Sequence, residues 1–277
     1  LYFIKISVEN YDPMTVASMR LIIAAVFLYS YHQFKGYKLN FTPIIFFYIF
    51  LAGLIGNFIP FFLISWSEQY IQSNTAGLLL SVAPILALIF SHFFTKDDKF
   101  TLRKFISILI GITGVLFILG FNELLNISKN ELNLILPKLA VIVAAFGYVF
   151  SAIIAYNLKN INIITLTTYV TISAAIISFP FMIIAELNYT SVFSVKSFMP
   201  ILYLGLFPTA IAFLLRFYII SRAGPIFLSY VAYLIPVFAI LWGFLFLQET
   251  ISLNTGIGVC FVLIGVFISQ KPSEKNN

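Results

Sequence analysis

The sequence predicts an all-α membrane protein, a ten-helix bundle of two inverted five-helix repeats in which the first helix is largely missing. The first reason is composition: the chain has 277 residues, 61% of them hydrophobic and only 9% charged. A soluble domain carries roughly 25% charged residues. The second reason is length, because the apolar runs approach the ~20 residues that cross a bilayer as a helix. Alternating segments of about 10 residues, which would indicate an outer-membrane barrel, are absent from the sequence.

The third reason is an internal repeat. Gly53 and Pro84 are 31 residues apart, as are Gly205 and Pro236, and the second pair follows the first by 152 residues. At this offset identical residues meet at Gly53-Leu54, Phe61, Leu63, Pro84, Ala87 and Phe94, and acidic Asp97 meets acidic Glu249. A repeated pattern of this length predicts a duplicated helix bundle.

The membrane helices follow in order along the chain. The offset places the partner of the helix around 138–157 partly before residue 1, so residues 1–6 are expected to be the last turns of a first helix. A mature N-terminus left by a cleaved signal peptide is the alternative. Pro13 suits a first helical turn because its missing N–H costs nothing there. The predicted spans are 13–31, 42–65, 74–94, 103–120, 134–156, 163–185, 198–220, 226–247 and 253–269.

Between residues 122 and 133 a polar, Asn-rich connector separates the halves. We therefore expect a first repeat at 1–126, with the remnant of helix 1 and helices 2–5. The second repeat is expected at 127–277, with helices 6–10 and a polar tail. A short Arg-Ala-Gly-Pro sequence at 222–225 is expected to separate two of the helices in the second half.

The basic residues predict the orientation in the membrane. Ten spans would place both termini on one side, and sorting Lys and Arg by loop gives ten on that side and four on the other. Basic loops remain in the cytoplasm, so both termini are expected there, in a cell inner (plasma) membrane. The net charge of +6 is explained by this bias rather than by nucleic acid. Because each repeat has an odd number of helices, the second copy enters the membrane inverted, as in many secondary transporters.

Short motifs in this order resemble the EamA-type branch of the drug/metabolite transporter superfamily. They are Pro13…Arg20-Leu-Ile-Ile-Ala-Ala, Ser65-Trp-Ser-Glu-Gln-Tyr-Ile, Ala76-Gly-Leu-Leu-Leu-Ser-Val-Ala-Pro84, Lys96-Asp-Asp-Lys-Phe-Thr, Gly111-Ile-Thr-Gly-Val, Tyr233-Leu-Ile-Pro-Val-Phe-Ala, Gln248-Glu-Thr-Ile-Ser and Gly256…Leu263-Ile-Gly-Val. The chain departs from the pattern in its first helix and in Asp97-Asp98, where Glu is usual. The resemblance implies ten helices and the export or exchange of small metabolites, often amino acids.

Charged residues inside a span are the first candidates for a substrate pathway, because placing Arg at a helix centre costs about 2.5–3.5 kcal/mol. Arg20 lies about 10 Å into its helix. It either contacts substrate, caps carbonyls of a neighbouring helix or extends towards the interface. Arg216 lies near the predicted cytoplasmic end of its helix, where extension to the interface is the alternative to substrate contact.

Carboxylates lie only in loops and at the ends of spans, which argues against a proton pump with a buried carboxylate. Glu68, between Trp66 and Tyr70, is a candidate outer gate or proton site, with an ordinary interfacial residue as the alternative. Asp97 and Glu249 are expected to cap the helices that follow them.

Polar residues also recur at helical spacing beside two prolines. The first stripe joins Asn74, Ser81 and Pro84, and the second joins Ser229, Tyr233 and Pro236, with Tyr230 alongside. Each proline removes a helical hydrogen bond, so both are expected to be helix breaks that line a pathway. Close helix packing is the alternative. Asn57, Tyr148 and Ser151 are further pathway candidates.

The predicted function is secondary transport of small organic metabolites, amino acids or related compounds, by alternating access. No catalytic group, metal site or cofactor is expected: His32 and His92 lack acidic or Cys neighbours at ligand spacing, and no P-loop occurs. The alternatives are a membrane-embedded enzyme subunit and a structural helix bundle without transport. Substrate, coupling ion and the choice between monomer and homodimer stay open.

Overall fold

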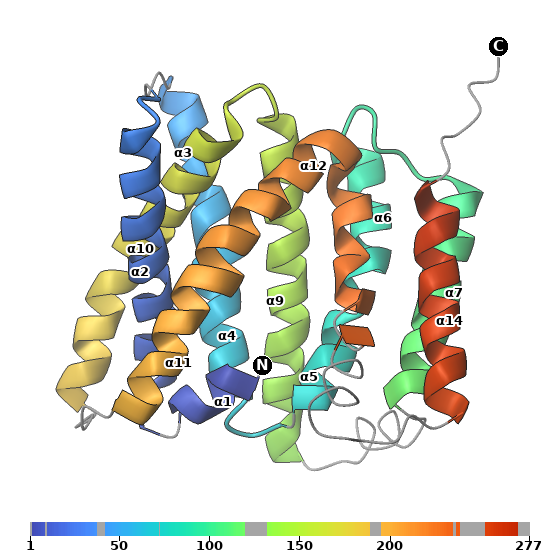
Figure 1. Cartoon of the computed structure of the whole chain (residues 1–277), viewed down its shortest axis with the longest axis horizontal. Helices are drawn as coiled ribbons and strands as arrows, with labels where there is room; N and C mark the ends of the chain where they lie inside the picture. Colours follow the sequence, from blue (N-terminus) through green and yellow to red (C-terminus); the bar gives the residue numbers. More distant parts are fainter. Residues whose placement is uncertain are drawn as a thin grey trace.

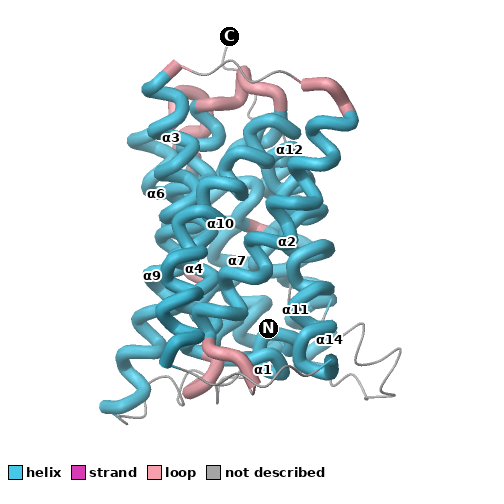
Figure 2. Tube along the Cα trace, turned by 90° about the vertical axis from the view of Figure 1, so that its left-hand side faces the viewer, coloured by secondary structure: helices cyan, strands magenta, loops and turns pink. Residues whose placement is uncertain are grey.

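The structure is a computed structural model, and it describes residues 2–8, 10–37, 42–71, 73–119, 132–188, 195–234, 237–238 and 253–270. Every regular element in these ranges is helical (Figures 1 and 2). Six helical segments are long and apolar enough to cross a membrane: Pro13–Phe34, Pro43–Ser67, Thr75–Phe94, Ile135–Asn157, Ile163–Leu187 and Phe198–Ser229. A shorter apolar helix covers Gly256–Ser269.

The first half begins with the short helix α1 (Tyr2–Val8), which turns into α2 (Pro13–Phe34). Asp12 caps α2 by accepting a hydrogen bond from the Met14 amide, 2.8 Å away. The remaining elements are α3 (Pro43–Gly53), η1 (Leu54–Phe58), α4 (Ile59–Ser67), α5 (Ser73–Leu80), α6 (Ala83–Phe94) and α7 (Leu102–Leu119). Here η1 is a single π-helical turn that joins α3 to α4 without a loop.

The second half contains α9 (Leu132–Asn157), α10 (Ile163–Asn188), α11 (Val195–Gly205), η2 (Leu206–Ile211), α12 (Ala212–Ser229) and α14 (Leu253–Gln270). Gly224 breaks α12 with a φ of 86°, a conformation that glycine adopts without steric cost. The expected interruption at 222–225 is therefore present. Asp98 stabilises it by accepting a 3.0 Å hydrogen bond from the Ile226 amide.

Two pairs of long helices flank the centre of the bundle. At one side α2 packs along α10, and at the other α7 packs along α14, with α4, α9 and α12 between them (Figure 1). The α7–α14 contact is close because glycines face it: a Cβ on Gly114 would lie 2.7 Å from the Gly258 carbonyl oxygen. Each pair joins one helix from the first half to one helix from the second half. The two halves therefore share one bundle instead of forming two separate ones.

The two π-helical turns occupy matching places in the halves. The first, η1, starts at Leu54 and η2 starts at Leu206, 152 residues later, the same offset that the sequence repeat shows. Each follows an α-helix that ends in glycine and leads without a loop into the next α-helix. The repeat in the sequence is thus accompanied by a repeat of an uncommon backbone feature.

Several helix ends that the sequence predicts on the same side of the membrane lie at the same end of the bundle. The C-terminal end of α2, the N-terminal end of α3, and the residues between α6 and α7 and between α9 and α10 lie at the upper end in Figure 1. At that end Asp97 pairs with Lys159 across 3.0 Å. The prediction that Asp97 caps α7 is wrong: α7 starts at Leu102, and Thr101 is the residue whose hydroxyl accepts from the Lys104 amide. Glu249 lies outside the described residues.

Candidate functional site

Arg20 lies in the middle part of α2 and is 5% exposed. Its Nη2 donates to the hydroxyl of Thr209 in η2, 3.3 Å away. Its guanidinium lies 4.0 Å from the ring centroid of Phe61 in α4. The Nε atom is buried and has no hydrogen-bond partner. Arg20 therefore contacts the other half of the chain with one N–H and keeps unused donors, and it neither caps a helix nor extends towards the interface.

Arg216 lies in α12, two turns before the break at Gly224. Its Nη2 donates to the Tyr148 carbonyl oxygen, 3.1 Å away. The guanidinium is 5.5 Å from the Tyr148 ring and 5.6 Å and 5.8 Å from the rings of Phe213 and Phe217. Because α12 continues to Gly224, Arg216 lies deeper than the sequence suggests, and its side chain is held among aromatic rings inside the bundle.

Tyr148 of α9 lies beside Arg216, with its ring 5.5 Å from the guanidinium and its carbonyl oxygen 3.1 Å from Nη2. The rings of Phe61 and Phe213 connect the two arginines, since their centroids are 5.8 Å apart and each ring also contacts one guanidinium. Helices α2, α4, α9 and α12 thus bring two arginines, a tyrosine and two phenylalanines to one place.

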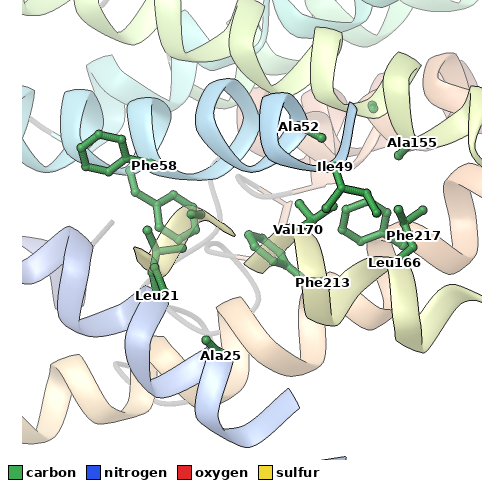
Figure 3. Packing of buried hydrophobic residues seen from close by; sticks show 14 of the residues in the cluster. Leu21, Ala25, Ile49, Ala52, Phe58, Ala155, Leu166, Val170, Phe213 and Phe217 are labelled. Carbon is green, nitrogen blue, oxygen red and sulfur yellow. The ribbon is translucent and has the colours of Figure 1, made fainter. Parts of the chain in front are cut away.

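The surroundings of this arginine site are apolar. Phe61, Phe213 and Phe217 belong to the largest hydrophobic cluster of the described residues, together with side chains of α2, α3 and α10. Figure 3 shows Phe213 and Phe217 from α12 near Val170 and Leu166 of α10. In such surroundings an unpaired charge is costly because the effective dielectric constant is low.

The arginines have no carboxylate partner in the part of the chain that the structure describes. The ion pairs found there join Lys104 to Asp98 and Lys159 to Asp97, at the end of the bundle. An uncompensated positive charge inside a membrane helix bundle marks a functional site by default. The arrangement is suited to binding an anion.

Asn57 is a second unusual group, located in η1. It is completely buried, and neither its amide nitrogen nor its amide oxygen has a hydrogen-bond partner. An unpaired buried side-chain amide costs about 1–3 kcal/mol. Thr209 holds the equivalent position in η2, 152 residues later, and is equally buried.

Ser151 and Ser229, two other predicted pathway residues, donate hydrogen bonds to backbone carbonyl groups. Ser151 donates to the Ala52 carbonyl oxygen at 3.2 Å, where Gly56 brings η1 against α9. Ser229 donates to the Ile226 carbonyl oxygen at 2.6 Å. These hydrogen bonds give both hydroxyls a structural role in the conformation seen here.

Tyr230 and Tyr233 pack against α7 rather than near the arginines. The Tyr230 hydroxyl bonds with the Ser107 hydroxyl, and the Tyr233 hydroxyl donates to the Ile108 carbonyl oxygen at 3.4 Å. Tyr233 also fills the space above Gly111, where a Cβ would lie 2.5 Å from its ring. Both tyrosines belong to a different hydrophobic cluster from Phe61 and Phe213.

The first stripe is interrupted at Ser81. Helix α5 ends at Leu80, Ser81 and Val82 form a turn, and Pro84 stands in the first turn of α6. Ser81 is buried and donates to the Leu78 carbonyl oxygen. Glu68 is buried at the C-terminal end of α4. The side chain of Asn74 and all of Pro236 lie outside what the structure describes.

Sequence reasoning missed Thr209 and the aromatic residues Phe61, Phe213 and Phe217. Thr209 was detectable, since the offset of 152 aligns it with Asn57. The same offset aligns Phe61 with Phe213, whereas Phe217 carried no signal among the 32 phenylalanines of the chain. In the described residues, no group of three or more His, Cys, Asp or Glu side chains is placed to hold a metal ion.

Comparison with known families decides what kind of protein carries this site. The EamA-like transporter family matches residues 1–120 and, a second time, residues 134–270. The chain belongs to the EamA-like transporter family. It is a multi-pass membrane protein, and the two matches correspond to the two halves of the helix bundle.

Relatives of this EamA-family chain are transporters by name. It is 26% identical over 272 residues to the uncharacterized transporter YoaV of Bacillus subtilis (strain 168), covering 96% of this chain and 89% of that one. It is 27% identical over 271 residues to an uncharacterized transporter of Archaeoglobus fulgidus, covering 96% and 91%. It is 27% identical over 254 residues to the uncharacterized inner membrane transporter YedA of Escherichia coli (strain K12), covering 91% and 79%.

The fold of this EamA-family member also matches a solved crystal structure. The TM-score is 0.78 at 17% sequence identity, over 98% of this chain and 92% of the other. The helix arrangement described above is therefore an arrangement seen experimentally. At this identity the likeness concerns the fold alone.

Proposed function

We propose that this EamA-family protein is a secondary transporter that moves small organic metabolites, amino acids or related compounds, by alternating access between two inverted repeats. The observation that carries the proposal is the arginine site: two arginines without a carboxylate partner among the described residues, at the junction of α2, α4, α9 and α12. Intramembrane arginines of this kind face a substrate pathway in membrane proteins.

The helix irregularities support movement around this site. Elements η1 and η2 each place a π-helical turn in a membrane span, and such turns occur frequently at functional sites. Asn57 and Thr209 lie in these turns, and Thr209 bonds directly to Arg20. The turns are places where the two halves can bend relative to each other while the substrate is held between them.

The proposal includes a topology. The repeats are residues 1–126 and 127–277, oriented oppositely, in the inner (plasma) membrane, with both termini in the cytoplasm. In secondary transporters built this way the substrate binds near the bilayer midplane, at the junction of the repeats. Helix packing supports the arrangement, since α2 pairs with α10 and α7 with α14 across the halves.

Transport is tested with the full-length protein in liposomes, loaded with a panel of amino acids and organic acids. Retention of every solute, by protein whose folding is verified by a cooperative thermal transition, would contradict a transport function. It would favour a structural bundle instead. Release that depends on Arg20 or Arg216 is the expected result, with Arg222→Gln as the control, because exposed Arg222 lies on the same helix outside the site.

The inverted topology is tested separately with single cysteines. In a Cys260→Ala background, Lys35→Cys and Leu187→Cys probe equivalent positions, because 152 residues separate them, and both side chains are exposed. A membrane-impermeant maleimide should label position 187 in intact cells and position 35 only after permeabilisation. Labelling of both positions from the same side would contradict the inversion.

A further inference from the structure

We propose that Arg20 and Arg216 together bind the carboxylate of an organic acid with an apolar body, and that this anion is the transported species. This inference rests on the proposed transport function and names its substrate class. It is carried by what the two guanidinium groups contact, by what they lack and by the side chains around them.

The first argument is charge. Arg20 is almost fully buried, and Arg216 is half-buried among three aromatic rings. Both guanidinium groups stay protonated, since arginine does not lose its proton in proteins. In the described residues no carboxylate pairs with either arginine, so an anion that lies between them would neutralise charge that the protein leaves uncompensated.

The second argument is hydrogen-bonding capacity. A guanidinium has five N–H donors in a planar fork that matches the two oxygens of a carboxylate. One donor of Arg20 bonds to Thr209 and one donor of Arg216 bonds to the Tyr148 carbonyl oxygen. The Nε of Arg20 is buried without a partner. The site therefore has charged donors to offer to an oxyanion.

The third argument concerns the rest of the ligand. Phe61 covers one face of the Arg20 guanidinium, and Phe213 and Phe217 surround Arg216. These rings would contact an apolar body attached to the carboxylate. An amino acid would also bring an ammonium group, and in the described part of the site no carboxylate is present to receive it. The chemistry thus favours a simple organic acid anion over a zwitterion.

The test compares solutes that share a body and differ in charge. Three pairs are used: butyrate and butyramide, 4-methylpentanoate and 4-methylpentanamide, and phenylacetate and phenylacetamide, with leucine as the zwitterion of the middle body. Binding to the purified full-length chain is measured by ligand-induced thermal stabilisation, and movement is measured in liposomes. Wild type, Arg20→Gln, Arg216→Gln and Arg20→Lys are compared with the control Arg222→Gln.

At least one acid is expected to bind about tenfold or more tightly than its amide, since a charge-assisted hydrogen bond contributes about one such factor. Both Gln variants should remove this preference. Arg20→Lys should retain part of it, and Arg222→Gln should keep it fully. If no acid is preferred over its amide, or if the Gln variants keep the preference, the inference is wrong.

The two proposals fail in distinguishable ways. Movement of leucine or of neutral amides that is insensitive to both Gln substitutions would overturn the carboxylate site and leave transport intact. Acid-specific binding without movement of any solute would contradict transport and support the site.

A phospholipid headgroup is the other source of an oxyanion, so binding is also measured with phosphatidylglycerol in the micelles. If the lipid abolishes acid binding and its own stabilising effect needs both arginines, the site belongs to lipid and the inference is overturned.

Discussion

Asn57 and Thr209 occupy equivalent positions in the two repeats: each lies in a π-helical turn, each is fully buried, and 152 residues separate them. Their environments differ. Thr209 accepts a hydrogen bond from Arg20 and donates to the Leu204 carbonyl oxygen, whereas the Asn57 amide has no partner. The equivalent positions thus differ: one bonds to an arginine, and the other has a buried amide without a hydrogen-bond partner.

The unpaired amide of Asn57 leads to the first prediction. Asn57→Leu should raise the free energy of unfolding by about 1 kcal/mol, because it removes an unsatisfied buried amide and fills its place with apolar atoms. Solute movement should fall at the same time if the amide contacts substrate. Thermal unfolding and liposome transport measure the two effects.

Thr209→Val is the matched variant: it should destabilise the protein by about 1–3 kcal/mol, because it leaves a donor of Arg20 unpaired. A loss of stability in Asn57→Leu would show that the amide has a structural partner.

A second prediction concerns the close approach of η1 to α9 at Gly56. A Cβ on Gly56 would lie 2.0 Å from the Cβ of Ser151, so Gly56→Ala should destabilise the protein by about 1–3 kcal/mol. Gly256→Ala is the control: nothing lies within 4 Å of its added Cβ, and alanine favours a helix by up to about 1 kcal/mol over glycine.

Adding Ser151→Gly to Gly56→Ala should recover part of the loss, with a coupling energy of about 0.5–3 kcal/mol in the double-mutant cycle. Additive effects of the two substitutions would mean that the helices separate instead of clashing.

The third prediction separates packing from substrate contact at Tyr230. This residue is 2% exposed and its hydroxyl bonds with Ser107 and with the Lys104 carbonyl oxygen. Tyr230→Phe keeps the ring and removes these hydrogen bonds, so it should lower the free energy of unfolding by about 1 kcal/mol. The apparent affinity for transported solute should not change, because Tyr230 packs against α7 away from the arginines. A change in the affinity for solute without a change in the free energy of unfolding would indicate that Tyr230 contacts the solute.

The fourth prediction is a pH dependence at the end of the bundle where Asp97 meets Lys159. The hydrogen bond and charge of Lys159 lower the pKa of Asp97 below its ordinary value of 3.8, and the pKa of Lys159 is raised above 10.5 chiefly by the hydrogen bond to Asp97. The pair therefore contributes stability between these values. That contribution is lost as the pH falls through the lowered pKa of Asp97, and again as it rises through the raised pKa of Lys159.

Asp97→Asn should accordingly melt at a slightly lower temperature than the wild type at pH 7, and the difference should vanish at low pH. The effect is small because the pair is exposed and screened by salt. Arg222→Gln is the control, since it removes an exposed positive charge that lies over Tyr218 and takes no part in the Asp97–Lys159 ion pair. An equal difference between wild type and Asp97→Asn at pH 7 and at low pH would contradict the assignment.

The helix bundle was predictable because its signals are long. Apolar runs such as 13–31 and 163–185 define spans by length alone, and the described helices agree with them. The repeat of Gly53 and Gly205 also located the two π-helical turns, although it did not indicate their geometry. A π-helical turn needs one extra residue in a helix and leaves no compositional trace, so only the backbone reveals it.

The site was predictable only in part. A charge in an apolar run is conspicuous, which is why Arg20 and Arg216 were found from the sequence. Their connection through the rings of Phe61 and Phe213 depends on how distant helices pack, and no spacing along the chain contains that information. The stripe of Ser229, Tyr230 and Tyr233 was a weaker signal, because polar groups at helical spacing serve helix contacts as readily as a pathway.

The matching π-helical turns have a consequence for the history of the chain. A π-helical turn is an α-helix with one residue too many, so each marks an insertion event. Two independent insertions would have no reason to fall at the same place in both halves. We therefore expect that the extra residue was already present in an ancestral single repeat and was copied with it. Any single-repeat descendant of that unit should carry the same bulge, one residue after a helix that ends in glycine.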